Sequence, residues 1–201
     1  MFVRVVKIGG SLEGADELKK LLTYLLAEGK EKTVIVPGGG SFANNVRKLQ
    51  TRTGFSDKYA HRMALLAMEQ YACYLTALTP ELQTADSLSS IFDSLTDNDL
   101  TLWRPYKMLF SESTLPASWD VTSDSLAAWL ALKIEADSLT LVKSAALPES
   151  YSGWGELAQL GLVDNYIENL LGQADLNVYW LQKDEYLSVL SPSSKSLIFQ
   201  Q

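Results

Sequence analysis

The hydrophobic positions of this chain change their spacing repeatedly, and the changes predict an alternation of strands and helices. Short, nearly continuous apolar runs are typical of buried strands, whereas apolar residues at every third or fourth position are typical of helices. By these criteria, the predicted strands are residues 2–8, 33–36, 82–86, 138–143, 178–181 and 196–199. The predicted helices are residues 15–28, 42–51, 56–78, 87–95, 126–134, 156–161, 166–171 and 184–190.

The order of these elements predicts an α/β fold with a largely parallel sheet. Residues 100–109 form a further apolar run, but Arg104 and Pro105 interrupt it. Because proline cannot donate a hydrogen bond to a sheet, we expect this run to be at best an edge strand. Residues 145–155, which contain one proline and two glycines, are predicted to form a loop.

Two glycine-rich turns each follow a predicted buried strand. They are Gly9-Gly10-Ser11, which comes just after Lys7, and Pro37-Gly38-Gly39-Gly40-Ser41. Glycines let backbone N–H groups approach a ligand closely, and a helix start adds unpaired donors and the positive end of a dipole. Either turn alone is equally well explained as a tight strand-to-helix connection, but two of them favour a shared anionic ligand. Neither turn matches the Walker pattern or the spaced Rossmann fingerprint.

The predicted sheet would bring these turns together. Ligands of open parallel sheets gather at the carboxyl ends of the strands. Lys7, both glycine turns and Lys143, which ends the predicted strand 138–143, are all placed at such ends. The sequence therefore predicts an anion site, with phosphate as the natural ligand class, at this edge.

Composition restricts the partners of the chain. The 201 residues are expected to form one domain with a sizeable core. A formal net charge of −7 argues against a nucleic acid or an anionic membrane as the main partner. The single cysteine, Cys73, excludes an internal disulfide framework, and its apolar helical context predicts a core position. No apolar run is long enough to span a bilayer, and we expect a cytoplasmic protein without a membrane partner.

Asp124 and His61 are candidate site residues, and each also has a structural explanation. Asp124 lies just before the predicted helix 126–134, where an acidic side chain also complements the helix dipole. His61 is the only histidine, and a single histidine is more often a surface or core residue than a ligand. One histidine excludes a zinc site built on histidines, and we assign no residue as a metal ligand.

Three segments in this order carry a family resemblance: Val6-Lys7-Ile8-Gly9-Gly10-Ser11, Pro37-Gly38-Gly39-Gly40 and Ser123-Asp124-Ser125-Leu126-Ala127. They resemble the amino-acid kinase family, the group of acetylglutamate, aspartate, glutamate and uridylate kinases. The resemblance covers most of the chain and is strongest up to about Lys143. Residues 42–44, the surroundings of His61 and residues 118–126 are similar to a branch of small archaeal and methylotroph proteins. Its methanogen members are kinases of an aminomethyl-furan-methyl phosphate in the synthesis of methanofuran-type C1 carriers.

The resemblance implies an open three-layer α/β/α sandwich formed by one domain, residues 1–201. In this family, the acceptor binds over the N-terminal half, here about residues 1–115, and ATP over the C-terminal half, about residues 116–201. Lys7 and Asp124 would be catalytic: Lys7 would neutralise charge on the transferring phosphoryl group, and Asp124 would hold the cationic groups in place. The resemblance also implies ATP with Mg²⁺, a small-molecule acceptor and a homo-oligomer.

Ligand contacts follow from the same resemblance. Backbone N–H groups of Gly9, Gly10, Gly39 and Gly40 would bind phosphate oxygens. The expected phosphate and acceptor contacts are Gly9, Gly10, Ser11, Gly38, Gly39, Gly40, Asn44, His61 and Ser123, and the expected nucleotide contacts are Lys143 and Ser144. His61, Tyr59 and Trp119 could line a pocket for a flat furan ring, but ordinary packing explains each equally well.

The chain departs from the family pattern in its nucleotide half. Many relatives have an Asp-Gly pair after the strand that here ends at Lys143, but this chain has Ala145-Ala146. Many also carry a lysine in a late helix, whereas residues 161–171 contain none. We hypothesise that Lys143 substitutes for that lysine in space. Two alternatives remain: a non-catalytic binding or regulatory member of the family, or a kinase of an amino-acid carboxylate or a nucleoside monophosphate.

Overall fold

The computed structural model describes residues 2–29, 31–183 and 196–197. Its strands are β1 (Val3–Ile8), β2 (Lys32–Pro37), β3 (Gln83–Ala85), β4 (Leu100–Trp103), β5 (Ser138–Lys143), β6 (Asn177–Gln182) and β7 (Ser196–Leu197). Its α-helices are α1 (Asp16–Glu28), α2 (Gly40–Thr53), α3 (Asp57–Leu78), α4 (Leu88–Asp97), α5 (Tyr106–Leu109), α6 (Ser123–Lys133), α7 (Trp154–Gln159) and α8 (Ile167–Leu171). A short 3₁₀ helix, η1 (Gly10–Leu12), follows β1. The predicted helix 184–190 and the end of the predicted strand 196–199 lie outside the described residues.

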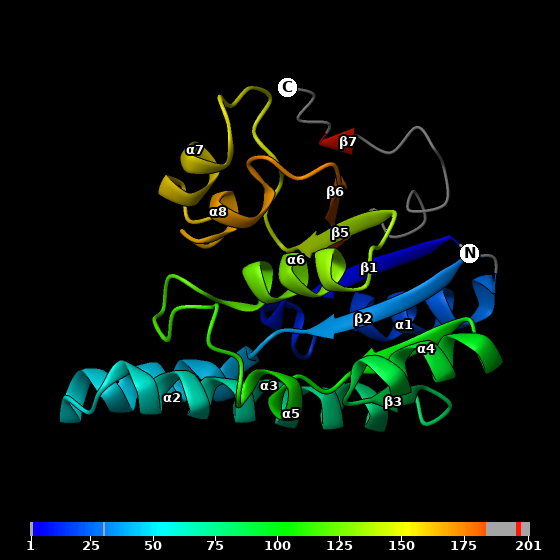
Figure 1. Cartoon of the computed structure of the whole chain (residues 1–201), viewed down its shortest axis with the longest axis horizontal. Coiled ribbons are helices and arrows are strands. Elements are labelled where there is room, and N and C mark those ends of the chain that lie inside the picture. Colours follow the sequence, from blue (N-terminus) through cyan, green and yellow to red (C-terminus); the bar gives the residue numbers. More distant parts are fainter. Residues whose placement is uncertain (1, 30, 184–195, 198–201) are drawn as a thin grey trace.

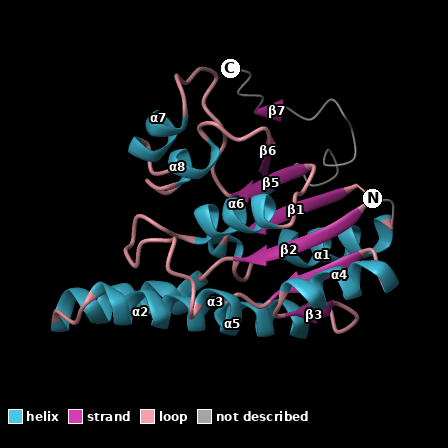
Figure 2. Ribbon diagram, in the orientation of Figure 1, coloured by secondary structure: helices cyan, strands magenta, loops and turns pink. Residues whose placement is uncertain are grey.

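The strands form one sheet in the order β3-β4-β2-β1-β5-β6-β7, with β1 at its centre. The first six strands in this order pair in parallel, and only β7 pairs antiparallel, with β6. Helices lie on both sides of the strands, with α6 in front of them and α1 behind in the orientation of Figures 1 and 2. The predicted α/β/α sandwich with a mainly parallel sheet is confirmed.

The two faces of the sheet have separate cores, and the alternation of β1 divides its residues between them. Val3 and Val5 pack with α6, α4, α7 and α8, whereas Val6 and Ile8 pack with α1 and the later part of α3. Successive side chains of a strand point to opposite faces. Lys7 therefore lies on the α6 face, at the carboxyl end of the central strand.

The expectation of an edge strand at residues 100–109 was wrong. The strand β4 lies between β3 and β2, one position inside the edge of the sheet. It ends at Trp103, so Arg104 and Pro105 lie beyond its ladder, and Pro105 begins the short helix α5 instead. A proline after a strand does not interrupt the strand's hydrogen bonds.

The expectation of a buried Cys73 was also wrong, because its side chain is exposed. The helix α3 contributes Leu65 and Met68 to one core and Tyr71 and Leu75 to the other, and Cys73 faces away from both. Apolar residues occur on most sides of this helix, so their spacing does not identify the buried face. In the described part of the chain, no helix has the length and apolarity that crossing a membrane requires.

Candidate active site

The two glycine turns meet backbone to backbone at the carboxyl ends of β1 and β2. The N–H of Gly38 donates to the carbonyl of Ile8 at 2.9 Å. A Cβ atom added to Gly10 would lie 2.2 Å from the nitrogen of Gly40, and one added to Gly38 would lie 2.4 Å from the nitrogen of Gly10. Only glycine allows so close an approach of two backbones. The turns therefore form one continuous surface, as the shared-ligand hypothesis requires.

Not every predicted glycine offers a free N–H group. Gly9 donates to the carbonyl of Val142 on β5 at 3.3 Å, and the N–H of Gly38 is used as described above. The expectation that the Gly9 N–H binds phosphate is therefore corrected: Gly9 and Gly38 join the turns to the sheet. Among the hydrogen bonds of the described residues, none uses the N–H groups of Gly10, Gly39 or Gly40. These three remain as backbone donors.

Glu13 and Tyr71 fix the geometry of the glycine surface, and sequence reasoning missed both. The Glu13 carboxylate accepts hydrogen bonds from the Ser41 N–H at 2.6 Å and from the Ser41 hydroxyl at 2.8 Å. It thereby caps the start of α2, whose first residue, Gly40, has a left-handed φ of 55°. The Tyr71 hydroxyl donates to the Gly9 carbonyl at 3.3 Å, and burial, helped by the charge of Glu13, raises its pKa. The hydroxyl therefore stays protonated and can donate its hydrogen bond to the first glycine turn.

Lys7, Asp124 and Lys143 form a buried cluster beside these turns. The Lys7 Nζ lies 2.9 Å from Asp124 Oδ1, and the Lys143 Nζ lies 2.5 Å from Asp124 Oδ2. Lys7 is 5% exposed and Asp124 is 4% exposed. Burial alone would raise the pKa of Asp124, but the two ammonium groups outweigh it and hold the pKa below its ordinary value. One carboxylate therefore holds two cations side by side.

Lys143 is enclosed by groups from several elements. Its Nζ donates to the Leu162 carbonyl at 2.8 Å and lies 5.6 Å from the ring centre of Trp180 on β6. Burial, followed by the charge of Lys7, lowers the pKa of Lys143 to about 8, although Asp124 opposes the shift. Lys143 is therefore mostly protonated at neutral pH, but it loses its proton more readily than an exposed lysine does. The hypothesis that Lys143 supplies a second cation is consistent with this position.

Asp164 is a buried carboxylate that sequence reasoning missed. It lies between α7 and α8, and it accepts hydrogen bonds from the N–H and hydroxyl groups of both Thr122 and Ser125. Burial and the nearby charge of Asp124 raise the pKa of Asp164. No motif surrounds it in the sequence, because its partners lie about forty residues earlier.

A cavity of about 290 Å³ opens on the glycine surface. It is lined by Gly10, Ser11, Gly39, Gly40, Ala43, Asn44, Arg47, Trp119 and Thr122. The predicted residues Ser11 and Asn44 are therefore at this site. Arg47 is exposed, and its guanidinium lies 4.3 Å from the ring centre of Trp119, whose Nε1 donates to Gln50. This stacking places a positive charge on the cavity wall.

A smaller cavity of about 50 Å³ shares several of these residues and has mostly apolar walls. It is lined by Gly39, Ala43, His61, Ala64, Leu65, Met68, Trp119, Val121, Thr122, Ser123 and Leu126. Burial lowers the pKa of His61, so its imidazole is neutral at pH 7. His61, Ser123 and Trp119 are thus brought together, but Tyr59 is 58% exposed and does not line either cavity.

Ser144 is the predicted residue that the structure does not bring to the cluster. It follows β5 and is exposed, and no hydrogen bond among the described residues joins it to Lys143 or Asp124. The next residue, Ala145, uses its carbonyl to accept a hydrogen bond from Trp180 Nε1 at 3.1 Å. The short turn after β5 therefore packs on β6.

The residues of the cluster are suited to phosphate oxygens rather than to a metal ion held by the protein alone. Both oxygens of Asp124 face ammonium groups. Within the described ranges, no group of three or more His, Cys, Asp or Glu side chains is arranged to hold a metal ion. Two lysines and three backbone N–H groups instead form a donor set for a polyphosphate, which brings its own Mg²⁺.

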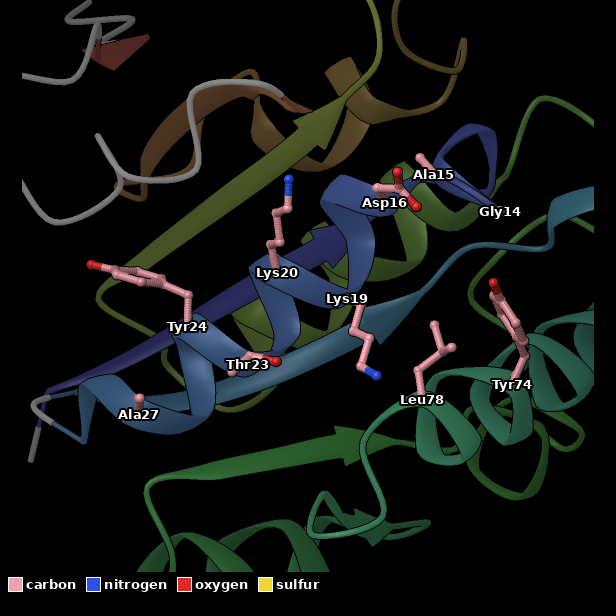
Figure 3. A pocket seen from close by; sticks show the side chains of 10 residues that line it. All are labelled: Gly14, Ala15, Asp16, Lys19, Lys20, Thr23, Tyr24, Ala27, Tyr74 and Leu78. Carbon is pink, nitrogen blue, oxygen red and sulfur yellow. The ribbon is translucent and has the colours of Figure 1, made fainter.

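A separate hollow of about 820 Å³ lies between α1 and the end of α3 (Figure 3). Lys19, Lys20 and Thr23 of α1 and Tyr74 and Leu78 of α3 are among its lining residues. None of the residues predicted from the sequence to form the site lines this hollow. The glycine surface lines both smaller cavities, and the hollow shares no lining residue with either of them.

The chain is similar to known proteins in sequence and in structure. The family model described as "Amino acid kinase family" matches residues 3–146. The [5-(aminomethyl)furan-3-yl]methyl phosphate kinase of Methanocaldococcus jannaschii is 28% identical over 187 residues, which are 88% of this chain and 86% of that protein.

Solved structures of low sequence identity share the fold. The uridylate kinase of Archaeoglobus fulgidus superposes with a TM-score of 0.69 at 13% identity, covering 96% of this chain and 97% of that one. The UMP kinase of Ureaplasma parvum superposes with a TM-score of 0.68 at 14% identity, covering 97% of each chain.

Proposed function

The chain belongs to the amino acid kinase family and is a kinase, and we propose that its Lys7–Asp124–Lys143 cluster transfers the terminal phosphoryl group of ATP to a small phosphorylated acceptor. The observation that carries this proposal is one buried carboxylate that binds two ammonium groups, 2.9 and 2.5 Å away, at the edge where the glycine turns end the central strands. Phosphoryl transfer needs positioning and charge compensation more than covalent chemistry by the protein.

The cluster would act by compensating charge on the transferring group. Lys7 and Lys143 would bind oxygens of the terminal phosphoryl group, and the N–H groups of Gly10, Gly39 and Gly40 would bind the phosphates beside it. The bond from the terminal phosphorus to the bridging oxygen of ATP breaks, and an oxygen of the acceptor phosphate forms the new bond. ADP and a diphosphate leave the site. Asp124 would keep the two lysines in place through this exchange.

The two smaller cavities support an acceptor with an anionic end and a flat, weakly polar ring. Arg47 supplies a positive charge to the larger cavity, and Ser11 and Asn44 line it with polar groups. The smaller one has apolar walls, with the neutral His61 and Ser123 at its edge. Together with the similarity to the [5-(aminomethyl)furan-3-yl]methyl phosphate kinase, they support an aminomethyl-furan-methyl phosphate as the acceptor. The product would enter the synthesis of a C1 carrier of the methanofuran type.

The proposed division of labour places the acceptor over residues 1–115 and ATP over residues 116–201. Most residues that line the two smaller cavities come from the first part, which supports the acceptor half. Lys143, at the end of β5, would contact the nucleotide phosphates. Mg²⁺ bound to ATP would screen the charge of its phosphate chain.

The turn after β5 favours one alternative, a member of the family that binds a nucleotide or an oxyanion without turnover. This turn has Ala145-Ala146 in place of the Asp-Gly pair that many relatives have, and Ser144 makes no hydrogen bond to the cluster within the described residues. Such a protein would bind MgATP or phosphate but form no ADP with any acceptor. Kinases of an amino-acid carboxylate or a nucleoside monophosphate are the remaining alternatives.

Initial rates of ADP formation with a panel of acceptors test the proposal. The panel contains [5-(aminomethyl)furan-3-yl]methyl phosphate, UMP and N-acetylglutamate, each with ATP and Mg²⁺. We expect turnover with the furan phosphate and at least tenfold lower kcat/KM with the other two. Faster turnover of UMP or N-acetylglutamate would replace the proposed acceptor, and turnover with none would favour the non-catalytic alternative. Lys7→Ala serves as the inactive control.

We further propose that the protein is a cytoplasmic homo-oligomer. The helix α3 carries two exposed apolar side chains one to two turns apart, Tyr59 at 58% and Leu66 at 44% exposure, which support a contact between copies. Sedimentation velocity of the wild type and of Leu66→Glu tests this contact. A monomeric wild type would contradict it.

A further inference from the structure

Asp164 binds the first turn of α6 from outside the helix. Its carboxylate Oδ2 accepts hydrogen bonds from the Thr122 N–H at 2.8 Å, the Thr122 hydroxyl at 2.8 Å and the Ser125 N–H at 3.0 Å. Its Oδ1 accepts one from the Ser125 hydroxyl at 2.5 Å. Thr122 and Ser125 stand on either side of Asp124 in the chain, so Asp164 holds the turn that carries the central carboxylate of the cluster.

The first turn of any helix has N–H groups without partners inside the helix, and a side chain at the N-cap often satisfies one of them. Thr122 is at the N-cap of α6, but its side chain makes no such bond. Asp164 takes this role instead, although it belongs to a different part of the chain. These four hydrogen bonds restrain Thr122 and Ser125, and thereby the first turn of α6 that carries Asp124.

The segment around Asp164 contacts the other side of the cluster as well. The Leu162 carbonyl accepts a hydrogen bond from the Lys143 Nζ at 2.8 Å. On the far side of Asp164, the Asn165 side chain donates to Asp120 Oδ1 at 2.8 Å. Residues 162–165 therefore hold both the helix that carries Asp124 and the lysine that pairs with it.

We propose that Asp164 is a positioning residue of the phosphoryl-transfer site, which fixes the first turn of α6 so that the Asp124 carboxylate faces Lys7 and Lys143 at once. Asp164 does not touch the reacting phosphates and acts through Asp124. The proposal rests on the proposed function of the cluster. The experiments below distinguish a failure of the positioning role from a failure of the proposed function.

Asp164→Asn is the principal variant. The amide keeps the size of the side chain, but it turns one acceptor oxygen into a donor that faces the N–H and hydroxyl donors of α6. We expect kcat to fall about 10- to 100-fold, since misplacing a catalytic group by a fraction of an ångström has effects of this order. The KM values for ATP and acceptor should stay within about threefold, because the binding residues are unchanged.

Two further variants separate positioning from folding. Asp120→Asn removes an exposed carboxylate that joins the same two segments without touching the first turn of α6, and we expect kcat within twofold of the wild type. Ser125→Ala leaves Asp164 in place and removes one of its four donors, and we expect a kcat loss of about 3- to 10-fold. If Asp164→Asn does not fold, the kcat of Ser125→Ala tests the proposal in its place. Wild-type kcat in a folded Asp164→Asn or in Ser125→Ala would overturn the proposal.

A titration of Lys143 tests the positioning without any acceptor. Lys143 faces Lys7 of β1, Asp124 of α6, Asp164, the Leu162 carbonyl and the Trp180 ring of β6. NMR of a lysine-labelled protein gives its pKa, with Lys143→Arg identifying the signal. In Ser125→Ala, which keeps the carboxylate of Asp164, we expect this pKa to fall below that of the wild type, because Asp124 is less well aimed.

The outcomes distinguish the two proposals. An unchanged Lys143 titration in folded Ser125→Ala overturns the positioning role, whether or not an acceptor is found. A wild type that turns over no acceptor, but whose Lys143 pKa falls in Ser125→Ala, overturns the proposed function and leaves the positioning role of Asp164 supported.

Discussion

Asp124 Oδ2 and Lys143 Nζ lie 2.5 Å apart, although Asp124 is in the first turn of the helix α6 and Lys143 ends the strand β5. The other oxygen of Asp124 binds Lys7 from the neighbouring strand β1. Because β1 and β5 pair in parallel, both lysines reach the same carboxylate from the same edge of the sheet. We therefore propose that Lys143 provides the second cation of the site.

We expect Lys143 to make the activity sensitive to alkaline pH. Its pKa is about 8, so the ammonium group is present below that pH and is lost as the pH rises through it. If this group binds ATP phosphates, kcat/KM for ATP falls on the alkaline side of about pH 8. Arginine keeps its charge throughout this range, so Lys143→Arg should move the alkaline limb upward by more than one pH unit. Identical limbs in the two proteins would assign the limb to another group.

Lys7→Ala should reduce the rate of phosphoryl transfer by at least ~10²–10³, the loss typical of removing one donor to a transition-state oxygen. Lys19 is an exposed residue of α1 that lies away from the site. Lys19→Ala removes the same positive charge as Lys7→Ala and should keep the wild-type rate. Single-turnover measurements with saturating ATP give the rates, and circular dichroism shows that both variants fold. Near-normal turnover by Lys7→Ala would refute its assigned role.

Gly10→Ala should destabilise the fold and reduce activity together. The added Cβ would meet the Gly40 nitrogen at 2.2 Å, so the two turns must move apart. Forcing extra volume into close contacts costs about 1–3 kcal/mol, which corresponds to a loss of roughly 2–12 °C in Tm for a chain of this size.

Gly153→Ala is the matched control for Gly10→Ala. A Cβ there meets nothing within 4 Å, and its φ of 161° is ordinary extended backbone. Thermal unfolding followed by circular dichroism compares the two variants. Equal Tm values would show that the contact between the glycine turns is not tight.

Arg47→Gln should weaken binding of a phosphorylated acceptor and leave ATP binding unchanged. Arg47 lines the cavity on the glycine surface, and losing a hydrogen bond from a charged group typically costs about 1.5–3 kcal/mol. We therefore expect the acceptor KM to rise about 10- to 100-fold, with the ATP KM within twofold. Arg52→Gln, at the exposed end of the same helix, is the control. Steady-state kinetics with each substrate varied in turn give the two KM values. A change in the ATP KM in place of the acceptor KM would contradict the role of Arg47.

The sequence predicted the local features of the site well. The glycine turns and Lys7 follow directly from a strand, two glycines and a helix start, and each lies where the parallel sheet places it. The pairing of Lys143 with Asp124 required the positions of β5 and α6 relative to one another, and the sequence supported it only as a hypothesis.

The features that were missed or wrong depend on contacts between distant segments. Asp164 binds residues about forty positions earlier, and no local pattern marks it. The stacking of Arg47 on Trp119 also has no local signal, because Trp119 approaches it from the other half of the chain. Residues 100–109, including Pro105, were expected to form at best an edge strand. The strand β4 ends at Trp103 instead, and where it ends depends on its pairing with β2 and β3, which residue types alone do not determine.

Calorimetric titration of ATP, with and without Mg²⁺, into the wild type, Lys7→Ala and Lys143→Ala tests the central claim most directly. If the lysine cluster is the site of phosphoryl transfer, the wild type binds ATP in a Mg²⁺-dependent manner, and Lys143→Ala binds it at least tenfold more weakly. Absence of binding at millimolar ATP, or equal affinity in all three proteins, would contradict the assignment of this cluster to the phosphates of ATP.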